Sequence, residues 1–414
     1  MSVTEKAFVL IKDIQNQSLL TGVYQPLVDL ILESQENVFH TCTSLDELMQ
    51  QLDIQENTAA ILCLLTNKIS ITTINLEQTF AQISEFISEC ADAQVKALPN
   101  LFSALCRFFT DKLIESKQYL RGVDPLCKAI TKAQNAPTQL TSIHCDLLKL
   151  CLLSKCLKPA LAFLDVDISD ISREADTFDV KYYLLYYYYG GIIYATFRNF
   201  ERSLFFLTSA ISVTGIAISE IVVEAYKKYI LVSLLVHGKV GLPPKQNANY
   251  LSRCIRPLSV AYTELASAYS EDNAEDLEKT FMKYHHVYER DTNVGLVKQV
   301  MASMVKVKIQ KLTKTFMTLS FGDMATRVNL AAGEAEAESI ILQMIEDEEI
   351  FASINQQDGN VLFLDKPEKY NSPAMYRLLE QELQKCVKLN EKLKELDQDI
   401  ALMPKYQKLR AALD

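Results

Sequence analysis

The stretch Thr318–Asp365, TLSFGDMATRVNL followed by AAGEAEAESIILQMIEDEEIFASINQQDGNVLFLD, decides the fold. It predicts a short helix, then an acidic helix over about Glu334 to Ile350, then two short strands joined across Asp358-Gly359. This order is the layout of a winged helix. The stretch carries no pattern of catalytic residues, so we expect a module that contacts other molecules without transforming them.

A winged helix often binds DNA, and the acidic helix tests that possibility. A DNA reader places its recognition helix in the major groove and contacts phosphates through Lys and Arg. Here the helix contains no basic residue. It carries seven carboxylates: Glu334, Glu336, Glu338, Glu346, Asp347, Glu348 and Glu349. These charges would repel a phosphate backbone, so groove binding is disfavoured, and a nucleic-acid-binding winged helix stays as the rival class.

The two strands, Phe351–Ile354 and Val361–Leu364, form a very small apolar sheet whose outer edges leave backbone groups unpaired. Strand addition from a similar module in another subunit would satisfy those groups and bury the apolar side chains. We therefore predict a subunit interface on this hairpin. Its residues are Phe351, Ile354, Val361 and Phe363.

A long amphipathic helix is expected beyond the hairpin, over residues 374–403. Its apolar positions alternate by three and four, which is the heptad pattern of a helix that packs against partner helices. The predicted interface residues are Leu379, Cys386, Leu389, Leu393, Leu396 and Ile400. We expect this helix to join a bundle formed with other chains.

The chain before the winged helix is expected to consist of paired helices. Three small residues are each followed four positions later by Leu: Gly122, Ala160 and Ser203. The clearest set matches the spacing of a tetratricopeptide hairpin: Gly191, Tyr194, Ser203, Leu207 and Ala210. The pattern predicts degenerate helical repeats stacked into a right-handed solenoid, so the fold class is mainly α.

Farther upstream, an apolar stripe with steps of four and three predicts a helix from Leu76 to Cys90, and Ala97-Leu98-Pro99 predicts a turn between helices. The tyrosines between Tyr182 and Tyr189 could stack on a ligand or pack between repeats. We favour packing, because they occupy all faces of one helix.

A basic helix is expected from Asp291 to Phe321. Its lysines are Lys298, Lys306, Lys308, Lys311 and Lys314. They are the strongest argument for nucleic acid, but a solvated face is the more ordinary explanation of such charges.

Composition excludes several function classes. The net charge of −10 removes a general attraction to nucleic acid or anionic membranes. We expect a reduced, intracellular protein, because the N-terminus has no secretion-signal pattern, the apolar segments are short and the ten cysteines form no CxxC pair.

Enzyme motifs are also missing from the sequence. The five histidines form no HExxH, and phosphate-loop and nucleophile-elbow motifs are absent. The group His144, Cys145, Cys151 and Cys156 could suggest a metal site, but buried helical cysteines explain it better. We therefore expect no catalytic residues, no metal and no cofactor.

Helical repeats that run into a winged helix resemble the PCI-domain family, found in the proteasome lid, the COP-nine signalosome and translation initiation factor complexes. Within the PCI-domain family, segments between residues 139 and 365 are similar to the family of third subunits of the signalosome. Among them are YYYYGGIIYATFRNFERSLFF, YKKYILVSLLVHGKV and MIEDEEIFASINQQDGNV. The segment KPEKYNSPAM extends the likeness toward the tail.

The resemblance implies a non-catalytic scaffold in the cytoplasm and nucleus, within a complex that removes a ubiquitin-like modifier from cullins and so regulates cullin-RING ubiquitin ligases. Its partners would be other PCI subunits, reached through the winged helix and the C-terminal helix, with the ligases contacted indirectly and neither nucleic acid nor membrane bound. A proteasome-lid or initiation-factor subunit is the nearest alternative.

The resemblance also implies a domain organisation. A repeat arm would span 1–196 and a PCI domain 197–366, with a helical part over 197–300 and a winged helix over 301–366. The C-terminal bundle helix would span 374–403. At Glu348, where similar chains are expected to carry glycine, we expect the acidic helix to end without a left-handed residue.

Overall fold

The computed structural model describes residues 16, 46, 49–70, 76–171, 179–213, 219–241, 250–271, 274–328, 333–356, 359–365 and 372–404. Much of the N-terminal part of the expected arm therefore lies outside the described residues, as does Asp358 at the hairpin turn. The chain divides into two compact units between Met304 and Val305. Each unit is considered by itself.

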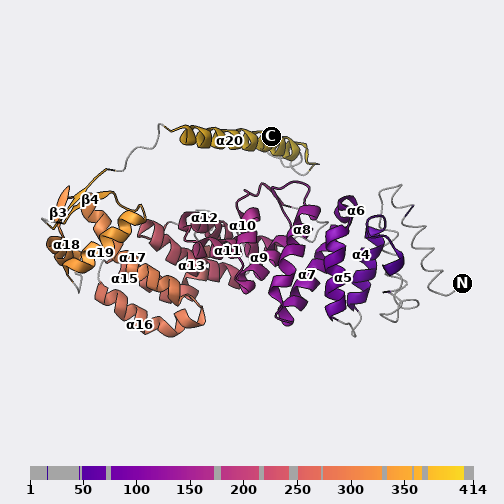
Figure 1. Ribbon diagram of the computed structural model, residues 1–414, viewed down its shortest axis with the longest axis horizontal. Helices are drawn as coiled ribbons and strands as arrows, with labels where there is room; N and C mark the ends of the chain where they lie inside the picture. Colours follow the sequence, from indigo (N-terminus) through magenta and orange to yellow (C-terminus); the bar gives the residue numbers. More distant parts are fainter. Residues whose placement is uncertain are drawn as a thin grey trace. The chain divides into compact units, whose positions relative to one another are not determined.

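The first unit is a succession of helices packed on one continuous apolar core (Figure 1). Most helices contact the next one or two along the chain, as expected of stacked hairpins. Its α-helices are α4 (Thr58–Ser70), α5 (Leu76–Glu89), α6 (Asp92–Ala97), α7 (Pro99–Glu115), α8 (Val123–Ala133), α9 (Ile143–Ser154), α10 (Lys158–Leu164), α11 (Val180–Thr196), α12 (Phe200–Ile211), α13 (Glu220–His237), α15 (Val260–Ser270), α16 (Ala274–Arg290) and the start of α17 (Val294–Thr313). The predicted mainly α, repeat-based fold is confirmed.

Local sequence signals explain where these helices begin and end. The apolar stripe on α5 buries Phe80, Ile83 and Ile87, whereas Leu76 at its start is exposed. The predicted turn is confirmed, because α6 ends at Ala97 and α7 begins at Pro99, whose missing N–H costs nothing in a first turn.

The predicted repeat hairpin is formed by α11 and α12. The Ser203 Oγ donates a hydrogen bond to the Gly191 carbonyl oxygen at 2.7 Å. A Cβ added at Gly190 would lie 2.6 Å from the Phe206 ring, and one added at Gly191 would lie 2.9 Å from Leu207. The two glycines therefore let the helices approach closely. This close approach explains why the glycines of α11 and the small and apolar residues of α12 occur at the spacing of a repeat hairpin.

The tyrosines of α11 pack between neighbouring helices. Tyr186 is fully buried, and its hydroxyl donates to the Phe163 carbonyl oxygen at 3.4 Å. Tyr187 is also buried and lies against Phe206, with ring centroids 5.3 Å apart. This is the packing role that the sequence favoured.

Several short elements were not expected from the sequence. Two-residue strands β1 (Gln139–Leu140) and β2 (Asp170–Ile171) form a parallel pair, and η2 (Tyr119–Gly122), η4 (Leu251–Ile255) and η5 (Arg256–Ser259) are single turns of irregular helix. Elements of this length are too short to produce a periodic pattern.

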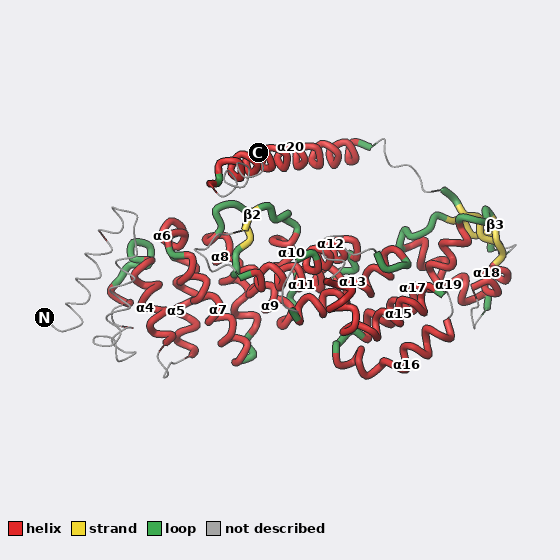
Figure 2. Tube along the Cα trace, turned by 180° about the vertical axis from the view of Figure 1, so that it is seen from behind, coloured by secondary structure: helices red, strands yellow, loops and turns green. Residues whose placement is uncertain are grey.

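The second unit begins within α17 and contains the winged helix. Its elements are β3 (Thr318–Ser320), α18 (Phe321–Val328), α19 (Glu334–Glu346), β4 (Ala352–Asn355) and β5 (Asn360–Phe363) (Figures 1 and 2). The expected basic helix does not reach Phe321. It ends at Thr313, and the strand β3 follows because its backbone pairs with β5.

The last described element is α20 (Pro373–Leu402), a 30-residue helix close to the expected 374–403. The Ser372 side chain caps it by accepting a hydrogen bond from the Met375 backbone N–H at 3.2 Å. Among all the helices described, none is long and apolar enough to cross a membrane.

Candidate assembly surfaces

The sheet of the winged helix has the order β3-β5-β4, with both pairs antiparallel. Alternate residues of β5 face opposite sides, as in any strand. Val361 and Phe363 are buried with α19 residues such as Ile341 and Met344, whereas Leu362 is 40% exposed. One face of the sheet thus closes the small core and the other lies at the surface.

The residues predicted for the hairpin interface fall into two groups. Val361 and Phe363 lie in the module's own core, whereas Phe351 and Ile354 are half-buried. Two residues that the sequence reasoning left out, Leu362 and Leu364, point outward. Counting the alternation from a known core residue would have identified them. Subunit pairing through this hairpin stays a prediction.

The free edges of the sheet also differ from the expected ones. β5 is the central strand, since β3 covers the edge that a two-stranded hairpin would leave open. In the described part of the chain, no further strand pairs with the outer side of β3 or β4. Strand addition would therefore use β3 or β4.

The acidic helix keeps most of its charge at the surface. Lys306 of α17 forms ion pairs with Asp347 at 3.1 Å and Glu349 at 3.0 Å. Glu334 and Glu346 are exposed. Lys306, one of the lysines that favoured nucleic acid, thus links α17 to the end of α19. The carboxylates of α19 still outnumber the lysines paired with them.

The end of α19 corrects one expectation. The helix stops at Glu346 rather than near Ile350, and Glu348 adopts a left-handed backbone with φ of 54°. The Glu348 and Glu349 N–H groups donate to the carbonyls of Ile345 and Met344 at 3.1 and 2.9 Å. These bonds satisfy carbonyls at the helix end, and closing the turn this way requires a positive φ at residue 348.

The second surface is α20. None of its side chains is buried. Of the predicted interface residues, Leu379, Leu389, Leu393, Leu396 and Ile400 are between 42% and 58% exposed. Cys386 is exposed as well. A 30-residue helix with an exposed apolar seam gains little stability from the other described residues, and its packing against partner helices stays a prediction.

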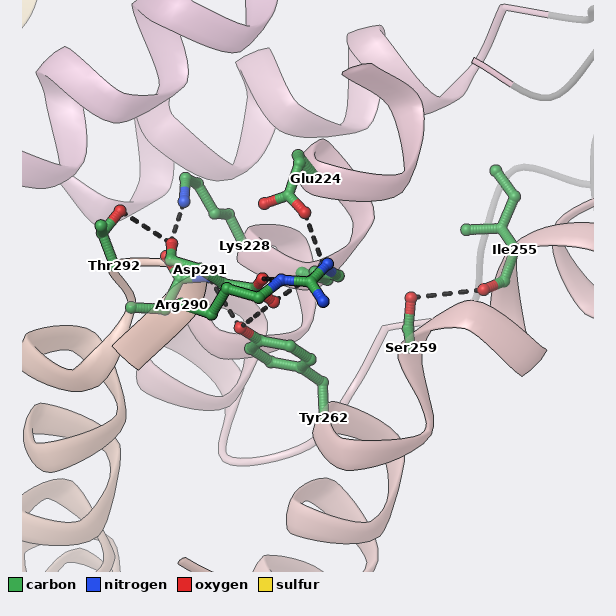
Figure 3. A network of polar contacts seen from close by, with 10 residues as sticks. Glu224, Lys228, Ile255, Ser259, Tyr262, Arg290, Asp291 and Thr292 are labelled. Atoms are coloured by element: carbon green, nitrogen blue, oxygen red, sulfur yellow. Dashed lines mark hydrogen bonds and ion pairs between the residues drawn. The ribbon is translucent and has the colours of Figure 1, made fainter. Parts of the chain in front are cut away.

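A polar network holds the last helices of the first unit together (Figure 3). Lys227 of α13 contacts Glu224 at 2.6 Å and Asp291 at 2.7 Å, and Tyr262 of α15 donates to the same Asp291 carboxylate at 3.0 Å. Burial lowers the pKa of Lys227, but its hydrogen bonds to the two carboxylates outweigh this and raise the pKa overall. The network ties α13 and α15 to the turn before α17.

A second polar cluster lies on α9, where the sequence suggested a possible metal site. The His144 Nε2 accepts a hydrogen bond from the Gln134 amide at 3.1 Å, and its Nδ1 lies 2.9 Å from the Thr141 hydroxyl. The Cys145 thiol donates to the Tyr182 carbonyl oxygen at 2.8 Å. Both ring nitrogens are thus engaged within the protein, and the described residues contain no cluster of three metal-ligating side chains.

Comparison with known proteins covers nearly the whole chain. The family model described as "COP9 signalosome complex subunit 3, N-terminal helical repeats" matches residues 21–251, and the PCI-domain model matches 275–365. These matches do not test the boundaries expected at 196 and 366.

Two relatives that align over most of their length carry the same name. A Drosophila melanogaster protein named "COP9 signalosome complex subunit 3" is 37% identical over 406 residues, covering 94% of this chain and 91% of the relative. A Dictyostelium discoideum protein of that name is 36% identical over 384 residues, covering 92% of this chain and 91% of the relative.

Proposed function

Because the chain belongs to the COP9 signalosome subunit 3 family, whose helical-repeat and PCI models it matches, we propose that it is a non-catalytic scaffold subunit of that complex. In this role it regulates cullin-RING ubiquitin ligases indirectly, through a complex that removes a ubiquitin-like modifier from cullins. It works in the cytoplasm and the nucleus.

The single observation that supports this role best is the uncovered α20. Burying a fully exposed leucine side chain stabilises a complex by roughly 1.5–3 kcal/mol. Leu389, Leu393 and Leu396 are 57%, 58% and 42% exposed, so burying what remains of the three offers roughly 2–5 kcal/mol. That is a substantial part of an anchoring contact. Contacts with the other described residues bury none of these three side chains.

The winged helix supplies the second contact. Its outer sheet face carries Leu362 and Leu364, and the free sides of β3 and β4 can accept a strand from a neighbouring PCI subunit. Together the two surfaces fix both the position and the orientation of the chain in a larger assembly.

The anchor is tested by changing Leu389, Leu393 and Leu396 to Asp in the full-length chain. We expect the variant to fold but to bind its complex at least about thirtyfold more weakly, since each 1.4 kcal/mol is about tenfold in affinity and a buried carboxylate adds to the loss.

The matched control places Asp at three positions on other faces of the same helix. These positions are Gln381, Gln384 and Gln398, which are uncharged and exposed, so both variants lower the net charge by the same amount. This control should co-purify with the complex as the unchanged chain does. Stoichiometric co-purification of the leucine variant would exclude the seam as the anchor.

The rival nucleic-acid function is tested by filter binding at low salt. We expect no retention of DNA or RNA beyond that of a neutral control protein, because α19 presents carboxylates where a reader presents Lys and Arg. Affinity that falls steeply with salt would contradict a scaffold-only role.

A further inference from the structure

The first unit contains a cavity of about 440 Å³ that neither assembly surface uses. It lies between α11, α13 and the turn that joins α16 to α17, and Tyr188, Lys228 and Gln299 are among the residues that line it. None of the residues described around it is Asp or Glu, although the chain carries a net charge of −10. Its only charged lining side chains are those of Arg198 and Lys228.

Lys228 is a buried cation with a neutral partner. Its side chain belongs to a residue only 8% exposed, and its Nζ donates to the Asn293 Oδ1 at 2.6 Å. Figure 3 shows the amine turned toward the Asp291–Thr292 turn. An ammonium has three N–H donors, and the described residues provide this one hydrogen-bond acceptor. A buried charge without a paired counter-charge is costly, so this amine favours an anion beside it.

The nearby carboxylates are already engaged by another lysine. Glu224 and Asp291 hydrogen bond to Lys227 at 2.6 and 2.7 Å. Burial lowers the pKa of Lys228 and outweighs the opposing influence of these two carboxylates. Among the described residues, the Lys228 Nζ therefore has the Asn293 oxygen and, at 5.9 Å, the Tyr188 ring, but no carboxylate in an ion pair of its own.

Arg198 provides the second cation at the cavity. It is exposed and lies two residues beyond the end of α11, in the left-handed region with φ of 60°. Its backbone N–H donates to the Ala195 carbonyl oxygen at 3.1 Å, and among the described residues its guanidinium has no hydrogen-bond or ion-pair partner. An unengaged guanidinium can grip an oxyanion with two parallel N–H donors.

We propose that this cavity binds a phosphate group, held between the Lys228 ammonium and the Arg198 guanidinium. The Gln299 amide adds a neutral donor, and Tyr188 and Leu296 offer apolar surface to whatever carries the phosphate. The volume is that of a small-molecule site, so the group belongs either to a free small phosphate or to one phosphorylated side chain of a partner protein.

The site is tested by calorimetric titration of the full-length chain at constant ionic strength. The probes are inorganic phosphate, O-phosphoserine and a short phosphoserine peptide, with the unphosphorylated peptide as the reference. We expect at least one phosphate-bearing probe to bind with a Kd below about 1 mM and the unphosphorylated peptide not to bind.

Three variants locate the binding. Arg198→Ala and Gly295→Glu should each weaken it about tenfold or more, and Lys228→Met should abolish it, since hydrogen bonds to charged groups are the strong ones. A Cβ at Gly295 meets no atom within 4 Å, so the glutamate side chain begins in open space and brings a negative charge to the cavity. Lys181→Ala, at the opposite end of α11, is the control and should bind normally.

The outcomes separate the possible sources. Binding of inorganic phosphate or phosphoserine alone identifies a free phosphate, and binding of only the peptide identifies a phosphorylated partner. Absence of binding by all three phosphate-bearing probes at about 10 mM overturns the proposal. Binding that is unchanged in Arg198→Ala and Gly295→Glu also overturns it, because the phosphate would then occupy another place.

Discussion

Two buried titratable groups on α9 are expected to give the protein opposing pH dependences. Burial lowers the pKa of His144 from 6.5 to about 4, against a smaller opposing contribution from its hydrogen bond to Thr141. Burial also raises the pKa of Asp146 from 3.8 to about 7, with Arg107 lowering it less. Asp111 raises and Lys149 lowers this pKa slightly. Among the described residues, the Asp146 Oδ2 has no hydrogen-bond partner.

His144 makes the folded protein less stable in acid. Between pH 6.5 and 4 the unfolded chain binds a proton that the folded protein does not bind. The stability is fully present above pH 6.5 and is lost as the pH falls toward 4. At 1.36 kcal/mol for each pKa unit, the loss is roughly 3 kcal/mol.

Asp146 acts in the opposite direction. Between pH 3.8 and 7 the folded protein binds a proton that the unfolded chain does not bind. The stability is fully present below pH 3.8 and is lost as the pH rises through 7. The same conversion gives roughly 4 kcal/mol. Between about pH 4 and 6.5 the two contributions largely cancel in the unchanged protein.

Single substitutions should reveal each contribution. In His144→Gln only the Asp146 contribution remains. The free energy of unfolding should therefore fall by roughly 4 kcal/mol from pH 4 to 7, beyond the change that the protein's other titrating groups produce. In Asp146→Asn only His144 remains, so it should rise by roughly 3 kcal/mol from pH 4 to 6.5.

The assay is urea unfolding at several pH values, followed by the fluorescence of the 19 tyrosines of this tryptophan-free chain. The midpoint of the first-unit transition is compared between the two variants and the unchanged protein. If both variants keep the pH dependence of the unchanged protein, the reasoning about these buried groups is refuted.

Three further substitutions test the packing. Glu348→Gly should stabilise the second unit by about 0.5–1 kcal/mol in urea unfolding, because glycine adopts φ of 54° freely; a loss of stability would contradict the left-handed turn. Gly190→Ala should destabilise the first unit by about 1–3 kcal/mol through overpacking, whereas Gly295→Ala, with open space at its Cβ, should not destabilise it; equal effects would contradict the close approach. Asp291→Asn should cost about 3 kcal/mol in thermal unfolding, because Lys227 loses a buried counter-charge, and an unchanged Tm would refute the network.

Much of the fold could be predicted because its signals are local. The glycine spacing of the α11–α12 hairpin and the proline that begins α7 both act within a few residues. The heptad seam of α20 also appears directly in the sequence, since no contact within the described residues modifies it.

The errors arose where a distant strand decides the structure. Thr318–Ser320 reads as part of a helix in sequence, and it becomes a strand because β5, some 40 residues later, pairs with it. The same pairing fixes which side of β5 is buried. Val361 and Phe363 therefore enter the core and Leu362 stays outside, a choice that a four-residue apolar run leaves open.

The cavity beside Lys228 could not have been predicted either. Its residues come from α11, α13 and the turn before α17, and no short pattern joins them. A lysine in the middle of an apolar helix was the one available signal, because such a residue is seldom buried without a partner.

The most direct test of the scaffold role is mass spectrometry of the proteins that co-purify with the native full-length chain. We expect a stoichiometric set of PCI-domain subunits that belong to the signalosome, retained at high salt because the anchoring contact is apolar. A set made of proteasome-lid or initiation-factor subunits, or the absence of any stoichiometric partner, would contradict it.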